Sequence, residues 1–178
     1  MSGIFTLASF AAHLHQIDRD LKVTNEAIVA RACAMVAAEA KRVLGTYDYS
    51  WTPLAASTLE KKKADTPLLE TGAMRASIEW IAHDLQGLVG SNSDIAVWQE
   101  LGTSKIPPRP FLQGAAQHME PKIQKMAAKA VRAVMAGQGL HSAEMRELIH
   151  LLKHVAHQVK ETVDDLLEPE DKKKGTRR

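Results

Sequence analysis

The sequence has one cysteine and few aromatic residues. A single thiol in 178 residues, Cys33, excludes an internal disulfide framework and any zinc site built from several cysteines. Aromatic side chains make up only 4% of the chain. This argues against an all-β sandwich, because strands are enriched in aromatic and β-branched residues. Cys33 lies in an alanine-rich stretch, so we expect a small buried hydrophobe rather than a nucleophile.

The sequence also lacks an excess of one charge and a long apolar run. Its 23 Lys and Arg residues nearly balance 21 Asp and Glu residues, for a net charge of +2. A general nucleic-acid-binding domain usually has a strong basic excess. No segment reaches the roughly 18–20 apolar residues that span a bilayer, and residues 4–14, although apolar, do not read as a secretory signal. These features predict a protein of a reducing cytosol with no membrane partner.

The small net charge is concentrated at the C-terminus. Residues 168–178 hold five cations and three carboxylates, which account for the whole net charge and leave residues 1–167 neutral. They contain no large apolar side chain, so we expect a disordered basic tail. Three regions are predicted: an α+β domain over residues 1–136, an amphipathic helix over residues 137–167, and the tail.

The first half of the chain predicts a long helix and a β-hairpin. Residues 18–44 have helical apolar spacing, with Asp18 as a predicted N-cap and Gly45 as a stop. Residues 76–83 alternate apolar and polar side chains, as in a half-buried strand. The turn signal at residues 84–87 indicates an antiparallel return strand.

Two further helices are predicted after the hairpin. Residues 93–101 form a short apolar-faced helix, with Ser93 as its cap and Gly102 as its end. Residues 114–136 carry an apolar stripe at helical spacing. Pro121 within that stretch predicts either a kink or the true start of the regular helix.

The segment between these two helices is rich in proline. Pro107, Pro108 and Pro110 enforce an extended path over residues 103–112 and exclude a central strand. Arg109, held between prolines, is suited to pairing with a carboxylate or with backbone carbonyls. The predicted fold class is therefore α+β: an N-terminal helix packed on a small antiparallel β-sheet, a Pro-rich extended arm and a C-terminal helical hairpin with a heptad seam.

The heptad seam lies in the last predicted helix, residues 142–167. Apolar residues there alternate spacings of three and four over three repeats, which indicates a helix that packs on another helix. The partner is either the preceding helix or the same helix of another subunit. The seam residues are Met145, Leu148, Leu152, Val155, Val159, Thr162 and Leu166.

Motifs for catalysis are absent from the sequence. There is no P-loop, no dinucleotide-binding glycine motif and no nucleophile elbow. His150, His154 and His157 share one side of the last predicted helix, as a solvent-facing group, a metal site or a pH-sensitive trio. Glu100 is either a buried acid or a helix-end charge satisfied by a neighbour. We expect no enzyme activity, no cofactor and no metal.

Three stretches of the chain carry motifs in a fixed order: residues 51–54 leading to Thr58 and Lys61, residues 67–78, and residues 98–103 followed by residues 106–112. The entry to a hairpin consists of Leu69, Thr71, Gly72, Arg75, Ser77 and Ile78; the turn consists of Trp98, Glu100, Gly102 and Thr103; and the arginine–proline–phenylalanine arm consists of Arg109, Pro110 and Phe111. In this order and spacing, the motifs resemble those of the neck or tail-completion proteins of long-tailed bacteriophages and of the related virion-morphogenesis proteins, with Leu101 in place of the family's second aromatic residue. The resemblance covers residues 45–134.

The resemblance implies a non-catalytic assembly protein of the virion. Such proteins act at the head–tail junction or the tail end, often in six-fold rings, and are assembled in the host cytoplasm. The implied partners are other copies of this chain, connector or head-completion proteins, and tail-tube or tail-terminator proteins. The predicted interface residues are Trp98, Glu100, Gly102, Thr103, Ile106, Arg109, Pro110, Phe111 and Leu112.

Phe111 is predicted to anchor this interface, because a buried aromatic side chain can carry much of an interface's energy. On that prediction, Phe111→Ala leaves the monomer folded and weakens assembly. The alternative is an arm that folds back on its own core. Two other functions stay open: a DNA-contacting packaging or regulatory factor that uses the basic tail and Lys61–Lys63, and a metal-dependent enzyme that uses the three histidines.

Overall fold

The computed structural model describes residues 6–137 and residue 150. The predicted heptad seam, the basic tail, His154 and His157 lie outside the described residues, and His150 is helical and exposed. The elements are α1 (Leu7–Val43), α2 (Ala56–Lys62), α3 (Ala73–Ala76), β1 (Ile78–His83), β2 (Gln86–Ser91), α4 (Asp94–Leu101) and α5 (Phe111–Met135).

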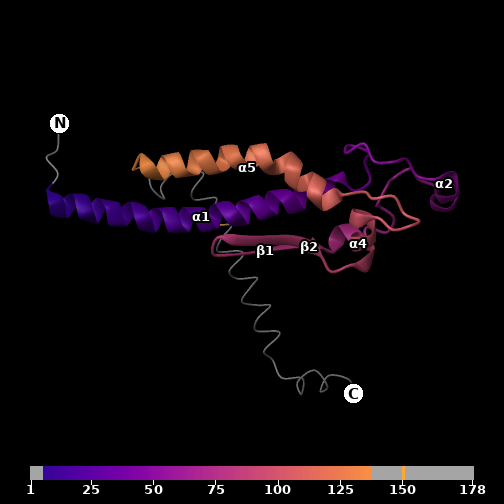
Figure 1. Cartoon of the computed structure of the whole chain (residues 1–178), viewed down its shortest axis with the longest axis horizontal. Helices are drawn as coiled ribbons and strands as arrows, with labels where there is room; N and C mark the ends of the chain where they lie inside the picture. The colour runs from indigo at the N-terminus through magenta and orange to yellow at the C-terminus, as the bar shows by residue number, and fades with distance from the viewer. Residues whose placement is uncertain (1–5, 138–149, 151–178) are drawn as a thin grey trace, which may run out of the picture.

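The described chain is an α+β protein built around α1. Helix α5 lies along one side of α1, and the two-stranded antiparallel sheet β1–β2 lies along the other (Figure 1). The short helices α2 and α4 gather at the end where α1 finishes and α5 begins (Figure 1). Within the described ranges, no helix has both the length and the apolar composition to cross a membrane.

Helix α1 begins eleven residues before the predicted start. Its cap is Thr6, whose Oγ1 accepts a hydrogen bond from the Ser9 amide at 3.2 Å. The prediction of Asp18 as N-cap is wrong, because Asp18 lies inside the helix and pairs with Lys22 at 3.4 Å on the surface. The predicted stop is confirmed: the helix ends at Val43, and Gly45 has a φ of +95°.

The small residues of α1 let the hairpin approach closely. Ala27, Ala30, Ala37 and Ala40 are almost fully buried. Cys33 is 8% exposed, which confirms that it is a buried hydrophobe, and burial raises the pKa of its thiol. A side chain at Gly87 would collide with the Cys33 sulfur, so a glycine in β2 sets the distance between the hairpin and the helix.

The hairpin follows the predicted alternation. Its register runs from Ile78 opposite Ser91 to His83 opposite Gln86. Ile78 is fully buried and Trp80 packs against the core, whereas the outward residues of β1 are exposed. The hairpin is therefore confirmed, but β1 begins at Ile78 because Ala76 ends α3, and β2 begins at Gln86, within the predicted turn.

Helix α5 begins at Phe111, three residues before the predicted start, and continues through Pro121. Pro121 therefore does not mark the start of the helix. The predicted stripe packs inward along α1, because Met119 and Val134 are buried and Ile123 is half-buried. The main core lies where the end of α1, the start of β1, α4 and the first turn of α5 meet.

Candidate functional site

The predicted interface residues lie around α4 and the start of α5. Glu100, near the end of α4, accepts hydrogen bonds from the backbone amides of Leu112 and Gln113, both at 2.9 Å. The N-cap residue of α5 is Pro110, which has no side-chain donor or acceptor. Glu100 therefore supplies the cap from another helix, and its negative charge lies at the positive end of the α5 dipole. The prediction of a helix-end charge satisfied by a neighbour is confirmed.

The arm between α4 and α5 is a tightly held loop. The Thr103 amide donates to the Ile106 carbonyl at 2.9 Å, and the Thr103 hydroxyl oxygen accepts from the Lys105 and Ile106 amides at 3.2 and 3.1 Å. Gly102 starts the loop at a φ of +75°, and a Cβ there would lie 2.9 Å from the Pro108 nitrogen. Only glycine suits this position, because the loop folds directly over it.

Arg109 and Phe111 are interior residues, which corrects two of the predicted interface contacts. Arg109 is 6% exposed, its backbone amide donates to the Gln99 carbonyl at 2.7 Å, and its guanidinium donates to the Thr52 carbonyl at 3.1 Å. Phe111 has no exposed surface and packs in the main core. The arm folds back on its own domain, because Phe111 is the first residue of α5 and its ring packs in the core beside residues of α1. The predicted pairing with backbone carbonyls is met by one carbonyl rather than in bidentate form, since the Arg109 Nε has no hydrogen-bond partner among the described residues.

The rest of the predicted interface is partly or fully accessible. Trp98 is 50% exposed on the outer face of α4, where Ile95 and Leu101 are also exposed. Ala96 is the only buried residue of α4. Thr103 is exposed, and the half-buried members of the predicted set are Glu100, Gly102, Ile106, Pro110 and Leu112.

The first motif of the resemblance joins the end of α1 to the hairpin. The Arg75 guanidinium donates to the Leu44 carbonyl at the end of α1. The Ser77 hydroxyl donates to the Met74 carbonyl at 2.9 Å and lies 2.7 Å from the Ser91 hydroxyl across the hairpin. Arg75 and Ser77 therefore stabilise the junction between the end of α1, α3 and the hairpin.

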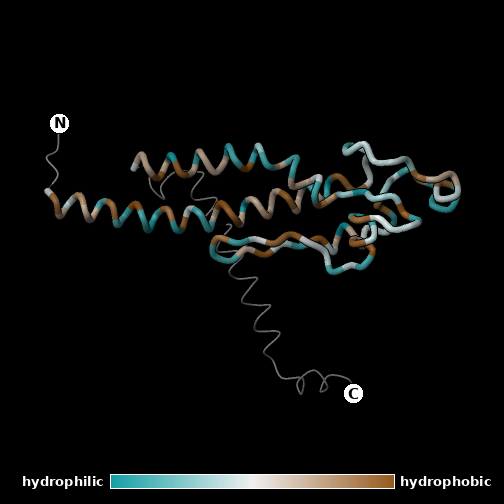
Figure 2. The backbone as a smooth tube through the Cα atoms, in the orientation of Figure 1, coloured by the Kyte–Doolittle hydropathy of each residue, from teal (hydrophilic) through white to brown (hydrophobic). Residues whose placement is uncertain are grey.

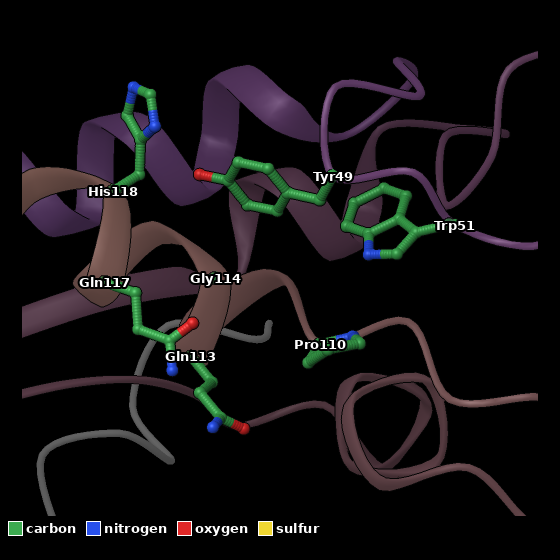
Figure 3. Close-up of a pocket in the computed structure, with 7 residues that line it drawn as sticks. All are labelled: Tyr49, Trp51, Pro110, Gln113, Gly114, Gln117 and His118. Atoms are coloured by element: carbon green, nitrogen blue, oxygen red, sulfur yellow. The ribbon is translucent and has the colours of Figure 1, made fainter.

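A pocket of about 490 Å³ opens beside the first turns of α5 (Figure 3). The rings of Tyr49 and Trp51 meet edge to face at 5.7 Å. Trp51 is 6% exposed, and its indole N–H has no hydrogen-bond partner among the described residues. No local sequence pattern predicts this pocket, because its walls come from segments that are distant in the chain. The lining residues are Tyr49, Trp51, Pro110, Gln113, Gly114, Gln117 and His118.

A buried carboxylate fixes Tyr49 at the edge of the pocket. Glu39 accepts two hydrogen bonds from Arg42, both at 2.8 Å, and one from the Tyr49 hydroxyl at 3.1 Å. The Arg42 hydrogen bonds hold the pKa of Glu39 below its ordinary value. Burial and the nearby Glu39 charge raise the pKa of Tyr49 to about 12. His118 Nε2 lies 3.8 Å from the same carboxylate.

Of the charged clusters considered from sequence, the structure describes the Lys61–Lys63 run and, among the three histidines, His150 alone. Among residues 6–137 and 150, no three His, Cys, Asp or Glu side chains are placed to hold a metal ion. Lys62 donates to the Thr66 carbonyl, so the Lys61–Lys63 run does not present three cations together.

Comparison of the chain with protein-family models, with curated proteins and with solved structures gave no match.

Proposed function

We propose that this chain is a non-catalytic structural protein of a bacteriophage virion, which acts at the head–tail junction or the tail end through ring-type contacts between subunits. The observation that carries the proposal is the outer face of α4. Ile95, Trp98 and Leu101 lie there with 53%, 50% and 75% of their surfaces exposed. An apolar cluster on a rigid element is typical of a protein–protein contact.

Packing within the monomer does not explain why these large apolar side chains of α4 are exposed. Helix α4 already has an inward contact through Ala96, and its larger apolar side chains point away from the core. The helix is held in place by Glu100 at the start of α5 and by the Arg109 amide on the Gln99 carbonyl. A surface ordered in advance loses less entropy when it binds.

The hairpin offers a second apolar surface. Ile81 and Leu88 are cross-strand partners, and they are 59% and 67% exposed on the face away from α1. Figure 2 shows hydrophobic stretches along both the hairpin and α4. Among the described elements, each strand of the hairpin has one edge without a paired strand, so a neighbouring subunit could add a strand there.

The test is the molar mass in solution, measured by light scattering over a series of concentrations. We expect a discrete oligomer for the natural chain, and a shift toward monomer for Trp98→Ala with unchanged thermal stability. Gln124→Ala, on the exposed side of α5, is the control and should assemble normally. A natural chain that stays monomeric at the highest attainable concentration would contradict autonomous ring formation. Unchanged assembly of Trp98→Ala would show that the α4 face is not the contact.

A DNA-contacting function is the second candidate, and one observation favours it. Lys122, Lys125, Lys129 and Arg132 are spaced by three, four and three residues, so they form one exposed basic stripe along α5. A protein that uses such a stripe and the basic tail on phosphates loses affinity steeply with salt. Fluorescence anisotropy with duplex DNA, repeated without residues 172–178 and with Lys122→Glu, tests this. Binding that is absent or insensitive to salt would remove the candidate.

A further inference from the structure

We infer that the heptad seam of residues 142–167 packs on the free end of α1, through the apolar stripe formed by Leu7, Phe10 and Leu14. The contact is intramolecular, and its occupant is a segment of the same chain of which the structure describes His150 alone. The inference goes beyond the proposed function and does not depend on it, because it concerns how one chain completes its own fold.

The free end of α1 exposes large apolar side chains. Leu7, Phe10 and Leu14 are 87%, 49% and 49% exposed, and every residue from 6 to 16 is exposed. The three side chains are spaced by three and four residues, so they lie on one side of the helix. A contiguous apolar surface of this kind marks a contact with another element.

The stripe continues the face of α1 that packs on α5. Ile17 and Leu21 follow Leu14 with the same spacing. Both are half-buried and pack with Val134 near the end of α5. Helix α5 ends at Met135, whereas α1 extends past it (Figure 1). Helix α1 thus has one apolar face, and α5 covers only the later part of it.

The chain leaves α5 beside the start of the uncovered stripe. Helix α5 runs antiparallel to α1, because it starts in the main core at the end of α1 and finishes beside Ile17. After a turn at Gly137, which has a φ of +70°, only residues 138–141 precede the predicted seam helix, and connections of roughly 2–8 residues are usual between packed helices. The seam is therefore tethered next to the stripe at a high effective concentration, which favours it over a second molecule.

The seam supplies an apolar face with a matching period. In both segments, four apolar residues are spaced by three, four and three positions. They are Leu7, Phe10, Leu14 and Ile17 in α1, and Met145, Leu148, Leu152 and Val155 in the seam. Two helices with this period interlock their apolar side chains along a shared seam. His150 falls at an outer position of the heptad frame, and it is helical and exposed, as that frame requires.

The contact has a measurable consequence for the backbone of α1. A projecting helical segment as short as residues 7–16 is only marginally stable in water by itself. Its amide hydrogens therefore exchange with solvent rapidly unless another element covers it. Slow exchange in this segment, dependent on the seam residues, is the signature of the inferred packing.

The experiment is hydrogen exchange of the full chain, followed by mass spectrometry of peptides that cover residues 7–16. Leu148→Asp with Leu152→Asp places two charges on the seam. We expect exchange of residues 7–16 to become at least about tenfold faster, because burial of a single leucine changes an equilibrium constant by about that factor or more. His150→Asp, at the outer position between them, is the matched control and should leave exchange unchanged.

The reciprocal substitutions test the same contact from the other side. Phe10→Asp with Leu14→Asp should accelerate exchange of residues 145–155. Ala12→Asp, at an exposed position on the opposite side of α1, is the control and should not.

Two results would overturn the inference. One is equal exchange of residues 7–16 in the natural chain and in the seam variant. The other is protection that disappears on dilution, because the stripe would then be covered by a second copy. Neither result bears on the α4 face, which Trp98→Ala tests. Conversely, a natural chain that is monomeric in light scattering contradicts autonomous ring formation and leaves the expected exchange pattern unchanged.

Discussion

A hydrogen bond between the Glu100 carboxylate and the Leu112 backbone amide links the end of α4 to the start of α5. The Leu112 amide in the first turn of α5 donates to Glu100 Oε2 at 2.9 Å, and the second oxygen takes the next amide along the helix. The side chain comes from the last turn of α4, twelve residues earlier. This cap sets the position of α4, and with it the position of the apolar face that we propose as a subunit contact.

Replacement of Glu100 should therefore destabilise the start of α5. Glu100→Ala leaves two amides without their acceptor, and we expect a loss of about 1–2 kcal/mol in the free energy of unfolding, the usual cost of a missing cap. Glu100→Gln keeps one acceptor oxygen and should lose less. Urea unfolding followed by circular dichroism measures both, and Glu120→Gln, on an exposed position of α5, should be close to neutral. Equal stability of Glu100→Ala and the natural chain would contradict the capping role.

Phe111 should behave as a core residue. Because its ring is fully buried beside Val43, Leu44 and Ile78, Phe111→Ala should cost about 3–5 kcal/mol of unfolding free energy. Phe10→Ala provides a matched control, since Phe10 is 49% exposed, and it should change stability by only about 0.5 kcal/mol. A Phe111→Ala protein that unfolds at the same urea concentration as the natural chain would restore the interface role predicted from sequence.

The contact between Gly87 and Cys33 should show up as a coupling between two substitutions. Gly87→Ala places a methyl group against the Cys33 sulfur, and overpacking of this kind costs about 1–3 kcal/mol. Cys33→Gly in the same chain removes the opposing atoms and should recover part of the loss that Gly87→Ala causes. Thermal unfolding of the four proteins of this double-mutant cycle measures the coupling. Gly90→Ala is the control, since a Cβ there meets nothing within 4 Å; additive effects would argue that the hairpin can shift away from α1.

Glu39 should make stability depend on acid pH. Its pKa in the folded state lies below the ordinary value of 4.5 because Arg42 donates to both oxygens. The stabilisation is therefore complete above pH 4.5 and is lost as the pH falls through the lower pKa of the folded state. Glu39→Gln should be less stable than the natural chain at neutral pH, and the gap should narrow on acidification below that value. Urea unfolding at several pH values measures this, with the exposed Glu60→Gln as control; a gap that is constant with pH would contradict the assignment.

Local signals in the sequence determined much of the fold. The alternation over residues 76–83 and the turn signal after it predicted the hairpin, because successive side chains of a strand point to opposite faces; the strand itself forms over residues 78–83. Ser93 and Gly102 mark the ends of α4 within one residue. The start of α1 was predicted wrongly, because the helix is capped by Thr6 and not by Asp18.

The candidate site needed the tertiary structure. The partner of the Arg109 guanidinium, Thr52, is 57 residues away, and no local pattern specifies a contact over that distance. Whether Phe111 contacts a partner or the core depends on which atoms surround it in the fold. Because the arm folds back, Phe111 is the first residue of α5 and its ring lies in the core. The pocket likewise depends on the fold, because Trp51 and Gln113 come from distant segments and line the same cavity. Sequence thus determined the elements through local backbone preference, whereas burial and long-range packing decided which side chains remain available to a partner.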